Sequence, residues 1–378
     1  LDKAGLIDLE DPEDLAKADS YVEVTGFAAT KLDEKVEQRR SGRRNETGEK
    51  TDTEFLTDLT SNLDDVVDVS IDAEEIGVKS DAMFDSLLES SENAADVKEV
   101  VAVAAEIGAK DKETMASVFT NVNQADAVKE VVSAASDLGA KDKDNLGSVF
   151  QNADKADDLK AVIDVAKETL GTAGEDGEKK LDVSSASILS STLKNADKAD
   201  SMKEVMEVAS DLGAQDAENL TAVFSNADKA DDLKAVMDVA KEALGSDDGT
   251  GTKKLDAGSA SILSSTLKNA DKADSMKEVM EVASDLGAQD AENLTAVFSN
   301  ADKADDLKAV MDVAKEALGS DDGSGTKKLD AGSASILSST LKNADKADSM
   351  KEVMEVAADL GAQDATNMTS VFQNADKA

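Results

Sequence analysis

Two near-identical loops contain the residues whose types and spacing come closest to those of a metal-binding site. Each loop reads SDDG(T/S)GTKKLDAG, so that aspartates lie among glycine and hydroxyl residues. Oxygen-rich loops that contain glycine can wrap a hard cation such as Ca²⁺. The candidate ligands are Asp247, Asp248, Asp256, Asp321, Asp322 and Asp330. The spacing matches neither an EF-hand loop nor a glycine-rich nonapeptide repeat, and two lysines interrupt it. A calcium site is therefore one interpretation, and a polar loop or helix cap is the favoured one.

A second acidic pattern is the recurring turn NADKADD. One copy holds Asn226, Asp228, Asp231 and Asp232. If the copies stack, these carboxylates would form an acidic ladder along one edge, which divalent ions could neutralise. The simpler interpretation is capping, because aspartate before a helix accepts amide hydrogen bonds and favours the positive end of the helix dipole. Capping explains most of this pattern.

All arginines of the chain lie in one polar excursion near its start. They are Arg39, Arg40, Arg43 and Arg44. One interpretation is a basic docking segment that meets an acidic surface on a partner or on another copy of the chain. The alternative, which charge clusters more often favour, is a solvated loop.

Residues for covalent or acid–base catalysis do not stand out. Histidine and cysteine are both absent, which removes imidazole bases, thiolates, disulfides and the usual zinc and haem ligands. Carboxylate pairs occur throughout the chain, so no pair differs from a solvated face. We expect no enzymatic activity and no cofactor apart from the calcium considered above.

The elements that would position these residues are set by an internal repeat. The stretch 195–268 returns as 269–342 with one change, Thr250 to Ser324. A looser copy occupies 121–194 and a partial copy occupies 343–378. Copying at a fixed period is the signature of a repeat architecture, in which each unit packs on its neighbours.

Each full repeat divides into two helical hairpins. Leucine–glycine or isoleucine–glycine pairs that would end helices recur at a constant spacing of 31 at first, and then at alternating spacings of 32 and 42. The first helix of one hairpin has apolar residues at helical spacing and a capping box formed by Ser201 and Glu204. Gly213 would end this helix, and Asp216 would cap the second. The predicted buried positions are Met202, Val205, Met206, Ala209, Leu212, Leu220, Val223 and Phe224.

The sequence therefore predicts an all-α fold, a right-handed-type α-solenoid of about ten helical hairpins. The basic element is a 31-residue unit, alternate units carry a loop insertion, and two units form the 74-residue super-repeat. The predicted divisions are a divergent N-terminal hairpin with a long basic loop (1–61), short-type hairpins (62–120), super-repeats (121–194, 195–268 and 269–342) and a partial super-repeat (343–378). The chain stops where earlier copies begin a new helix, so we expect a longer polypeptide.

Composition limits the classes of partner. The formal net charge is −41, from 82 acidic and 41 basic residues. Such a charge argues against binding nucleic acid through its phosphates and against adhesion to an anionic membrane surface. No apolar run approaches the length of a membrane span, so direct membrane insertion is not expected.

The expected function is structural. Near-perfect copying suits a scaffold, which needs the same geometry at every step, and the expected partners are copies of the chain or related repeat subunits. Long acidic repeats without cysteine and with few aromatic residues are similar to those of very large bacterial surface or appendage proteins. This resemblance implies an extracellular or cell-surface filament, sheath or surface assembly. Two alternatives remain, which are the stalk or binding solenoid of a surface adhesin and an acidic decoy that mimics nucleic acid.

Overall fold

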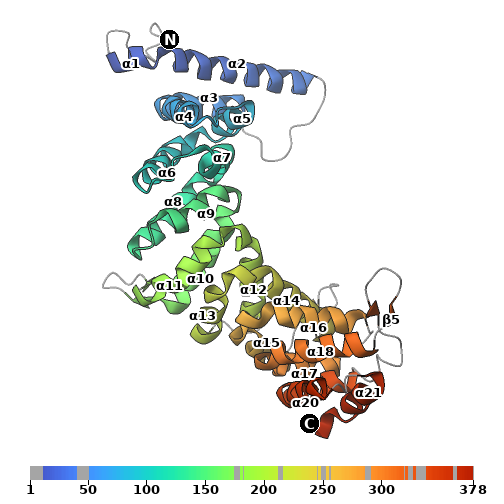
Figure 1. The fold of residues 1–378 in the computed structure, drawn as a ribbon. Helices are drawn as coiled ribbons and strands as arrows, with labels where there is room; N and C mark the ends of the chain where they lie inside the picture. Colours follow the sequence, from blue (N-terminus) through green and yellow to red (C-terminus); the bar gives the residue numbers. More distant parts are fainter. Residues whose placement is uncertain are drawn as a thin grey trace. The chain divides into compact units, whose positions relative to one another are not determined.

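The computed structural model is almost entirely α-helical, and its helices pack on neighbours in the sequence (Figure 1). The all-α prediction is confirmed. The described residues are 12–40, 51–173, 179–181, 183–211, 216–244, 246–247, 253–254, 257–285, 291–318, 320–321, 327–328, 338–360 and 364–377. The chain forms two compact units. Unit 1 comprises Leu1–Asp164 and Leu181–Ala199, and unit 2 comprises Val165–Lys180 and Asp200–Ala378.

Two kinds of helix alternate along the described chain. We call the longer helices first helices. They are α2 (Ala18–Arg40), α4 (Leu63–Ile76), α6 (Ala94–Glu106), α8 (Ala125–Asp137), α10 (Ala156–Leu170), α12 (Ala199–Asp211), α14 (Ala230–Leu244), α16 (Ala273–Asp285), α18 (Ala304–Leu318) and α20 (Ala347–Asp359). The second helices are α3 (Asp52–Ser61), α5 (Asp81–Glu89), α7 (Lys112–Thr120), α9 (Lys143–Gln151), α11 (Val183–Lys194), α13 (Ala217–Ser225), α15 (Ala257–Lys268), α17 (Ala291–Ser299) and α21 (Ala365–Gln373).

Short elements join these helices. A five-residue helix, α1 (Pro12–Ala16), precedes α2. One-turn 3₁₀ helices connect a second helix to the next first helix, and they are η2 (Ser91–Asn93), η3 (Val122–Gln124), η4 (Ala153–Lys155), η5 (Ala196–Lys198), η6 (Ala227–Lys229), η7 (Ala270–Lys272), η8 (Ala301–Lys303) and η9 (Ala344–Lys346). A further one, η10 (Ala375–Lys377), follows α21.

The loop insertions form small antiparallel hairpins, which the sequence pattern does not predict. In the first, β1 (Thr172–Ala173) pairs with β2 (Lys179–Lys180). The next two pairs are β3 (Ser246–Asp247) with β4 (Lys253–Lys254) and β5 (Ser320–Asp321) with β6 (Lys327–Lys328). Each β-hairpin closely follows the end of a long first helix, so it occupies the connection within a helical hairpin.

Within each unit, like helices pack on like. In unit 1, α4, α6 and α8 pack in succession, and so do α5, α7, α9 and α11. In unit 2, α14, α16, α18 and α20 pack in succession, and α15 packs on both α13 and α17. Each unit therefore contains a layer of first helices beside a layer of second helices (Figure 1).

The apolar stripe of each helix supplies the core between the layers. Met202, Val205, Met206 and Ala209 of α12 are each at most 2% exposed, as the helical spacing predicts. Leu220, Val223 and Phe224 of α13 are at most 1% exposed. The predicted core is confirmed at these positions, while Leu212 lies outside the described residues.

The ends of the helices follow the expected chemistry in most places. The carboxylate of Asp216 accepts hydrogen bonds from the backbone N–H groups of Glu218 and Asn219, which confirms it as the cap of α13. Gly213 lies outside the described residues, but Gly77 and Gly139 occupy the same kind of position with φ of 76° and 69°. L-residues with a Cβ rarely adopt this left-handed conformation, so glycine can end the first helix there.

The predicted capping box at Ser201 is wrong. Helix α12 begins at Ala199, so Ser201 lies inside its first turn. Its hydroxyl instead donates a 2.5 Å hydrogen bond to Asp231 at the start of α14. A complete capping box is present between Thr51 and Glu54 at the start of α3.

No helix in the described ranges combines the length and the apolar character that crossing a lipid bilayer requires.

Candidate functional site

The candidate calcium ligands fall mainly outside the described residues. Asp247 and Asp321 lie in β3 and β5, and the structure describes their backbone only. Asp248, Asp256, Asp322 and Asp330 are not described. The strand register sets Asp247 opposite Lys253 and Asp321 opposite Lys327. Directly opposite residues of an antiparallel pair share one face, so a lysine lies across from each of these aspartates.

The arginine segment is also described only in part. Arg39 and Arg40 are the last two residues of α2, while Arg43 and Arg44 lie outside the described residues. Earlier along the same helix, Lys31 forms ion pairs with Asp85 and Glu89 of α5, at 2.7 and 3.2 Å. Helix α2 thus contacts both layers of unit 1, because it packs on α4 as well as α5.

Among the residues that the structure describes, no group of three or more acidic side chains is arranged to hold a metal ion. Aspartates of the NADKADD turns contact cationic and hydroxyl groups instead. Asp232 pairs with Lys277 at 2.6 Å, and Asp305 accepts hydrogen bonds from Ser275 and Lys272. The turn therefore brings lysines to its carboxylates.

Lysines at one position of the first helices contact the first helix before them. We call these lysines, of which Lys98 is the first, the lysine ladder. In unit 1, Lys98 of α6 reaches back to Asp65 and Asp68 of α4, both at 2.7 Å. Lys129 of α8 repeats this contact with Asp96 and Glu99 of α6, at 2.8 and 3.0 Å. Each of these lysines neutralises carboxylates on the preceding helix.

The lysine ladder continues in unit 2. Lys234 of α14 lies 3.0 Å from Glu204 of α12, and the equivalent Lys308 lies 2.9 Å from Glu278. Lys277 pairs with Asp232 as described, and Lys351 of α20 pairs with Asp306 of α18 at the same 2.6 Å. Corresponding pairs in the two copies thus have matching distances.

Proton affinities in the lysine ladder follow from these contacts. Side-chain hydrogen bonds to Asp65 and Asp68 raise the pKa of Lys98 above its ordinary value. Although burial raises the pKa of Asp68, hydrogen bonds from Lys17 and Lys98 outweigh it, and the net direction is downward. The protonated ammonium of Lys98 and the ionised carboxylate of Asp68 therefore stabilise each other's charged form.

The NADKA turn makes the same contacts in each described copy. Its asparagine side chain donates a hydrogen bond of 2.8 to 2.9 Å to a carbonyl four residues earlier, as between Asn226 and Ala222. The next alanine is fully buried, as Ala227 and Ala301 are. The asparagine therefore ends the second helix, and the alanine allows close packing at the turn.

The lysine of the NADKA turn reaches the corresponding turn of the following hairpin. Lys229 lies 2.9 Å from Asp274, and Lys303 lies 3.1 Å from Asp348. Lys229 also donates to the backbone carbonyl of Asp271. Turns of neighbouring hairpins are thus joined by charge and by hydrogen bonds.

A buried polar contact joins successive second helices. The amide of Asn219 in α13 hydrogen bonds to the hydroxyl of Ser264 in α15 at 3.1 Å. Asn293 makes the same 3.1 Å contact with Ser338. Both asparagines are 0% exposed, so each contact satisfies a polar group that water does not reach.

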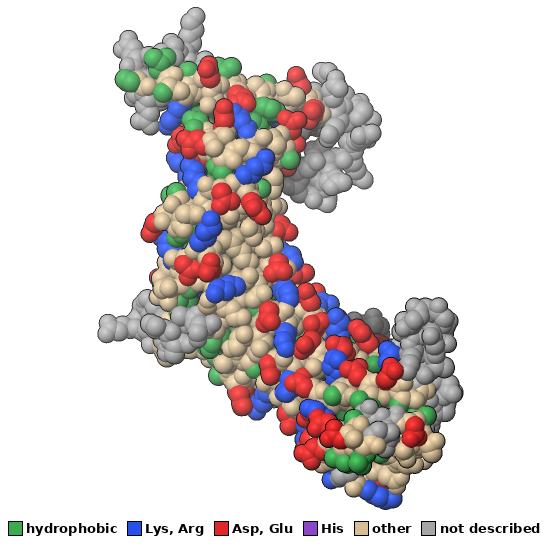
Figure 2. Space-filling view, viewed as in Figure 1, with side chains coloured by type: hydrophobic (Ala, Val, Ile, Leu, Met, Phe, Trp, Pro, Cys, Tyr) green, Lys and Arg blue, Asp and Glu red, His purple; other side chains and the backbone are tan. Residues whose placement is uncertain are grey.

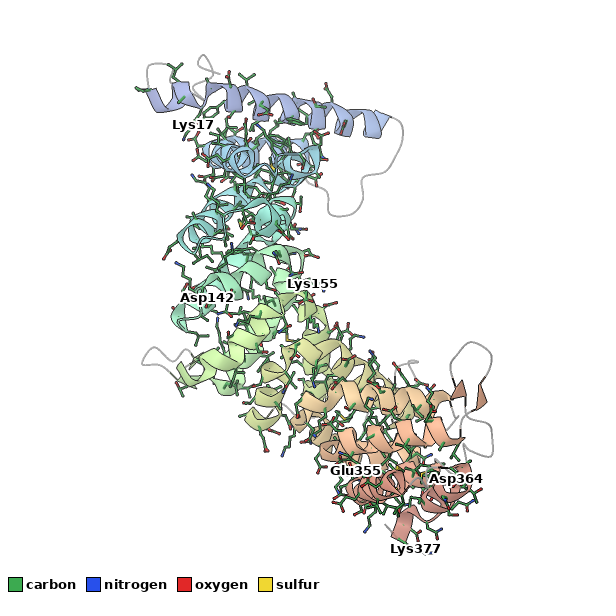
Figure 3. All side chains as sticks on the ribbon, in the orientation of Figure 1. Lys17, Asp142, Lys155, Glu355, Asp364 and Lys377 are labelled. Carbon is green, nitrogen blue, oxygen red and sulfur yellow. The ribbon has the colours of Figure 1, made fainter. Side chains whose placement is uncertain are left out.

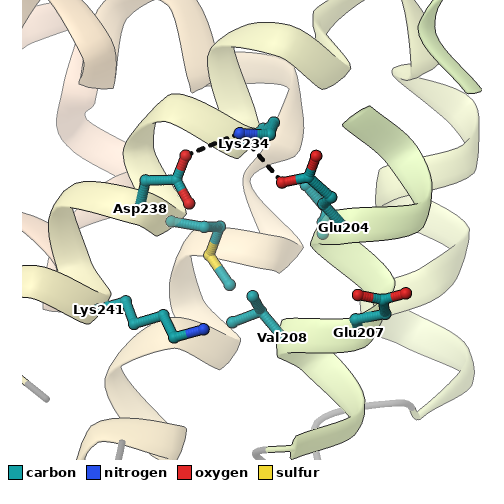
Figure 4. Close-up of a pocket in the computed structure, with 8 residues that line it drawn as sticks. Glu204, Glu207, Val208, Lys234, Asp238 and Lys241 are labelled. Atoms are coloured by element: carbon teal, nitrogen blue, oxygen red, sulfur yellow. Dashed lines mark hydrogen bonds and ion pairs between the residues drawn. The ribbon is translucent and has the colours of Figure 1, made fainter. Parts of the chain in front are cut away.

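A shallow groove lies between α12 and α14 (Figure 4). Its lining residues are Glu204, Val205, Glu207, Val208, Lys234, Met237, Asp238 and Lys241. Its volume is about 120 Å³, below the range of roughly 300 to 1,000 Å³ of small-molecule sites. The ion pair of Lys234 with Glu204 crosses it, while Lys234 also pairs with Asp238 of its own helix, so the groove is part of the contact between two helices.

Figure 2 shows acidic and basic side chains interspersed on the visible face, without a separate basic region among the described residues. The side chains drawn in Figure 3 include Lys155 of η4, which donates to the backbone carbonyl of Asp197 in η5. Lys155 thus contributes to the contact between neighbouring hairpins.

Residue types and spacings that indicate reactive groups do not identify the lysine ladder. Its signal is present in the repeat itself. A lysine stands at the same position of the first helices from α6 onward, and these residues are Lys98, Lys129, Lys160, Lys203, Lys234, Lys277, Lys308 and Lys351.

Comparison of the chain with known protein-family models, with curated proteins and with solved structures gave no match.

Proposed function

We propose that this chain is a non-catalytic structural repeat protein whose hairpins stack as an α-solenoid. The proposed architecture is a right-handed-type α-solenoid of about ten hairpins, built from the 74-residue super-repeat. It builds or decorates an extracellular filament, sheath or surface assembly, and its partners are other copies of the chain or related repeat subunits.

The observation that carries the proposal is the recurrence of the same inter-hairpin contacts in successive super-repeats. The pair Lys277–Asp232 returns as Lys351–Asp306, each at 2.6 Å. The buried contact of Asn219 with Ser264 returns with the same length in the next super-repeat. Contacts that return unchanged from one super-repeat to the next favour a regular geometry, which a scaffold requires.

The distribution of polar groups also supports a structural role. Lysines and carboxylates of the described residues join neighbouring hairpins, and one such pair, Lys234 with Glu204, crosses the groove between α12 and α14. A binding surface usually varies residues at chosen positions of an otherwise constant repeat. The super-repeats 195–268 and 269–342 differ at one position only.

Electron microscopy and sedimentation of the purified chain test the proposal. We expect elongated particles that associate as the concentration rises, in salt and calcium that screen the net charge of −41. A single monomeric species at high concentration under these conditions would contradict self-assembly.

A further inference from the structure

One position of the second helices changes with the kind of hairpin that follows. We call a hairpin long when its connection contains a β-hairpin, and short otherwise. The position lies seven residues before the asparagine that ends the second helix, as Asn219 lies before Asn226. Asparagine occupies it in α9, α13 and α17, each of which precedes a long hairpin. We call this position the selector position, and its three asparagines are Asn145, Asn219 and Asn293.

Second helices that precede a short hairpin carry other residues at the selector position. In α3, α5 and α7 they are Phe55, Met83 and Thr114, and in the long hairpins they are Ile188, Ile262 and Ile336. Wherever the sequence contains the following hairpin, asparagine at the selector position therefore coincides with a long one.

Each of the three asparagines contacts a serine of the following second helix. The hydroxyl of Ser190 in α11 donates a 2.7 Å hydrogen bond to the amide oxygen of Asn145. The contacts of Asn219 and Asn293 described above repeat this arrangement in unit 2. All three asparagines are at most 3% exposed. The hydroxyl therefore serves an amide that water does not reach.

The cap of its own helix holds each amide in place. The amide nitrogen of Asn145 donates to the carboxylate of Asp142 at 2.7 Å and to the carbonyl of Ala140 at 3.0 Å. That of Asn219 donates to Asp216, also at 2.7 Å. The amide oxygen in turn accepts a hydrogen bond from the serine of the next helix. Cap, asparagine and serine thus form one connected polar network.

The serine position also changes with the kind of step. It lies five residues before the asparagine that ends its own helix, and serine occupies it in the long hairpins. The short helices α7 and α9 have Ala116 and Gly147 there. The short helices that follow a long one, α13 and α17, have Thr221 and Thr295. The three kinds of step between hairpins therefore carry three kinds of residue pair.

An ion pair accompanies the asparagine–serine contact in unit 2. Glu218 of α13 lies 2.9 Å from Lys268 of α15, and Glu292 of α17 lies 3.0 Å from Lys342. The short helices α7, α9, α13 and α17 have serine, threonine or glutamine at the position of these lysines. A long second helix thus offers its short neighbour two partners that a short second helix lacks.

We propose that Asn145, Asn219 and Asn293 are specificity-determining residues, which select a long hairpin as the next unit through the serine of its second helix. A buried amide that loses a hydrogen-bond partner is destabilised, so a second helix with alanine or glycine at the serine position is a poor neighbour. A single buried asparagine fixes the register of coiled coils in the same way. The inference goes beyond the proposed function, because it concerns the order of hairpins within one molecule and does not require assembly.

Such selection matters in a chain whose units are near copies. Helices α13 and α17 have the same sequence, AENLTAVFS, so their apolar stripes do not distinguish one neighbour from another. If one hairpin were skipped, α17 would lie on α13. Asn219 would then meet Thr295, which is larger by a methyl group, and Glu218 would meet Ser299 in place of a lysine. The skipped arrangement therefore loses both contacts.

Transplantation of the pair into a step that lacks it tests the proposal. Helix α9 packs on α7, where Thr114 and Gly147 occupy the two positions. Thr114→Asn reproduces the spacing between cap and asparagine, because Asp111 caps α7. A Cβ added at Gly147 meets no atom of a neighbouring element within 4 Å, so Gly147→Ser can be accommodated.

Hydrogen exchange of α7 and α9 measures the coupling, at protein concentrations where the chain is monomeric. Gly147→Ser should raise amide protection about fivefold more in the Thr114→Asn background than in the parent. The control Gly147→Ala should raise it equally in both backgrounds. Additive effects of Thr114→Asn and Gly147→Ser would overturn the selection while leaving self-assembly untouched.

The native step between α9 and α11 provides the second measurement. Ser190→Ala should lower protection of both helices about tenfold. Ser148→Ala, at a half-buried site of α9, is the matched control and should have a smaller effect. Asn145→Met/Ser190→Ala installs the residues that α5 and α7 carry at these positions, and it should recover most of the loss. If Thr114→Asn does not fold, this step decides, and equal effects of Ser190→Ala and Ser148→Ala would overturn the proposal.

Discussion

The ammonium group of Lys98 lies 2.7 Å from a carboxylate oxygen of Asp68, on the preceding first helix. Lys17 lies 2.8 Å from the other oxygen of the same carboxylate. Asp68 lies in α4, Lys98 lies in α6, and Lys17 directly precedes α2. The carboxylate of Asp68 therefore links α4 both to α6 and to the residue before α2. Segments of three successive hairpins are held by one side chain.

A double-mutant cycle on Lys98 and Asp68 should show a small favourable coupling. Both side chains are partly exposed, and partly exposed ion pairs typically contribute about 0.2 to 1 kcal/mol. The double variant Lys98→Ala/Asp68→Ala should lose less free energy of unfolding than the two single variants lose in sum. Hydrogen exchange of α4 and α6 measures the coupling, and additive effects would mean that the pair contributes nothing.

The pKa of Asp68 predicts how the stability of unit 1 depends on pH. Its folded pKa is below the ordinary value of 3.8, so its contribution is complete above about pH 4 and is lost as pH falls through the folded pKa. The folded pKa of Lys98 is raised above 10.5, so its contribution is complete below that pH and is lost as pH rises further.

Thermal melting at a series of pH values from 7 to 3 tests the direction of this change for Asp68. Protonation also relieves the repulsion of 82 acidic residues, so the comparison must be with Asp68→Asn at each pH. The difference in melting temperature between the parent and Asp68→Asn should shrink in acid. A difference that stays constant from pH 7 to pH 3 would contradict the assigned role.

Removal of a buried aromatic ring should destabilise the hairpin that contains it and the hairpins packed on either side. Phe119 of α7 is 0% exposed, and Phe119→Ala should cost about 3 to 5 kcal/mol by leaving a cavity. Because each hairpin packs on its neighbours, amide protection should fall in α5, α7 and α9 while that of α16 and α18 persists. Glu113→Ala, at an exposed site of the same helix, is the control. Equal loss of protection along the whole chain would contradict local packing.

The threonine at one buried position should be replaceable by valine with a gain in stability. Thr266 of α15 is 0% exposed, and its hydroxyl has no hydrogen-bond partner among the described residues. Val223 and Val297 occupy the same position of the short hairpins. Valine has nearly the same shape, so Thr266→Val should stabilise by about 1 kcal/mol. Thermal melting measures this change, and a destabilisation would show that the hydroxyl is satisfied.

Salt should stabilise the folded chain because it screens the repulsion among its acidic side chains. At a net charge of −41, the melting temperature should rise as sodium chloride is added from low ionic strength. Since Lys253 lies opposite Asp247 in the strand pair, calcium at matched ionic strength should give no extra gain. An extra gain that disappears in the combined variant Asp247→Asn/Asp248→Asn/Asp256→Asn would establish the calcium interpretation of the loop instead.

The fold class and the core could be read from the sequence because apolar periodicity and repeat length are local signals. Met202 and Phe224 are buried as their spacing predicts. The start of α12 cannot be placed from the sequence because Ser201 satisfies the pattern of a capping box, while its actual partner, Asp231, lies in the next hairpin. The β-hairpins cannot be predicted because such short strands leave no alternation to detect.

The contacts between hairpins could be predicted only in part. The constant position of Lys98 and its counterparts was visible, but which carboxylate each lysine reaches depends on how first helices lie against each other. The roles of Asp247 and Arg43 stay predictions, since the described residues do not include the side chains that would test them.

The uniform NADKA turn makes whole super-repeats interchangeable. Lys268 and Lys342 precede the same turn, with Asn269 and Asn343 as its first residues. Excision of the stretch 269–342 would join Lys268 to Asn343 and create no junction that the chain does not already contain. Recombination between such copies could therefore lengthen or shorten the protein by one whole super-repeat at a time, without a need for compensating substitutions. The number of modules would then be free to vary under selection for size alone.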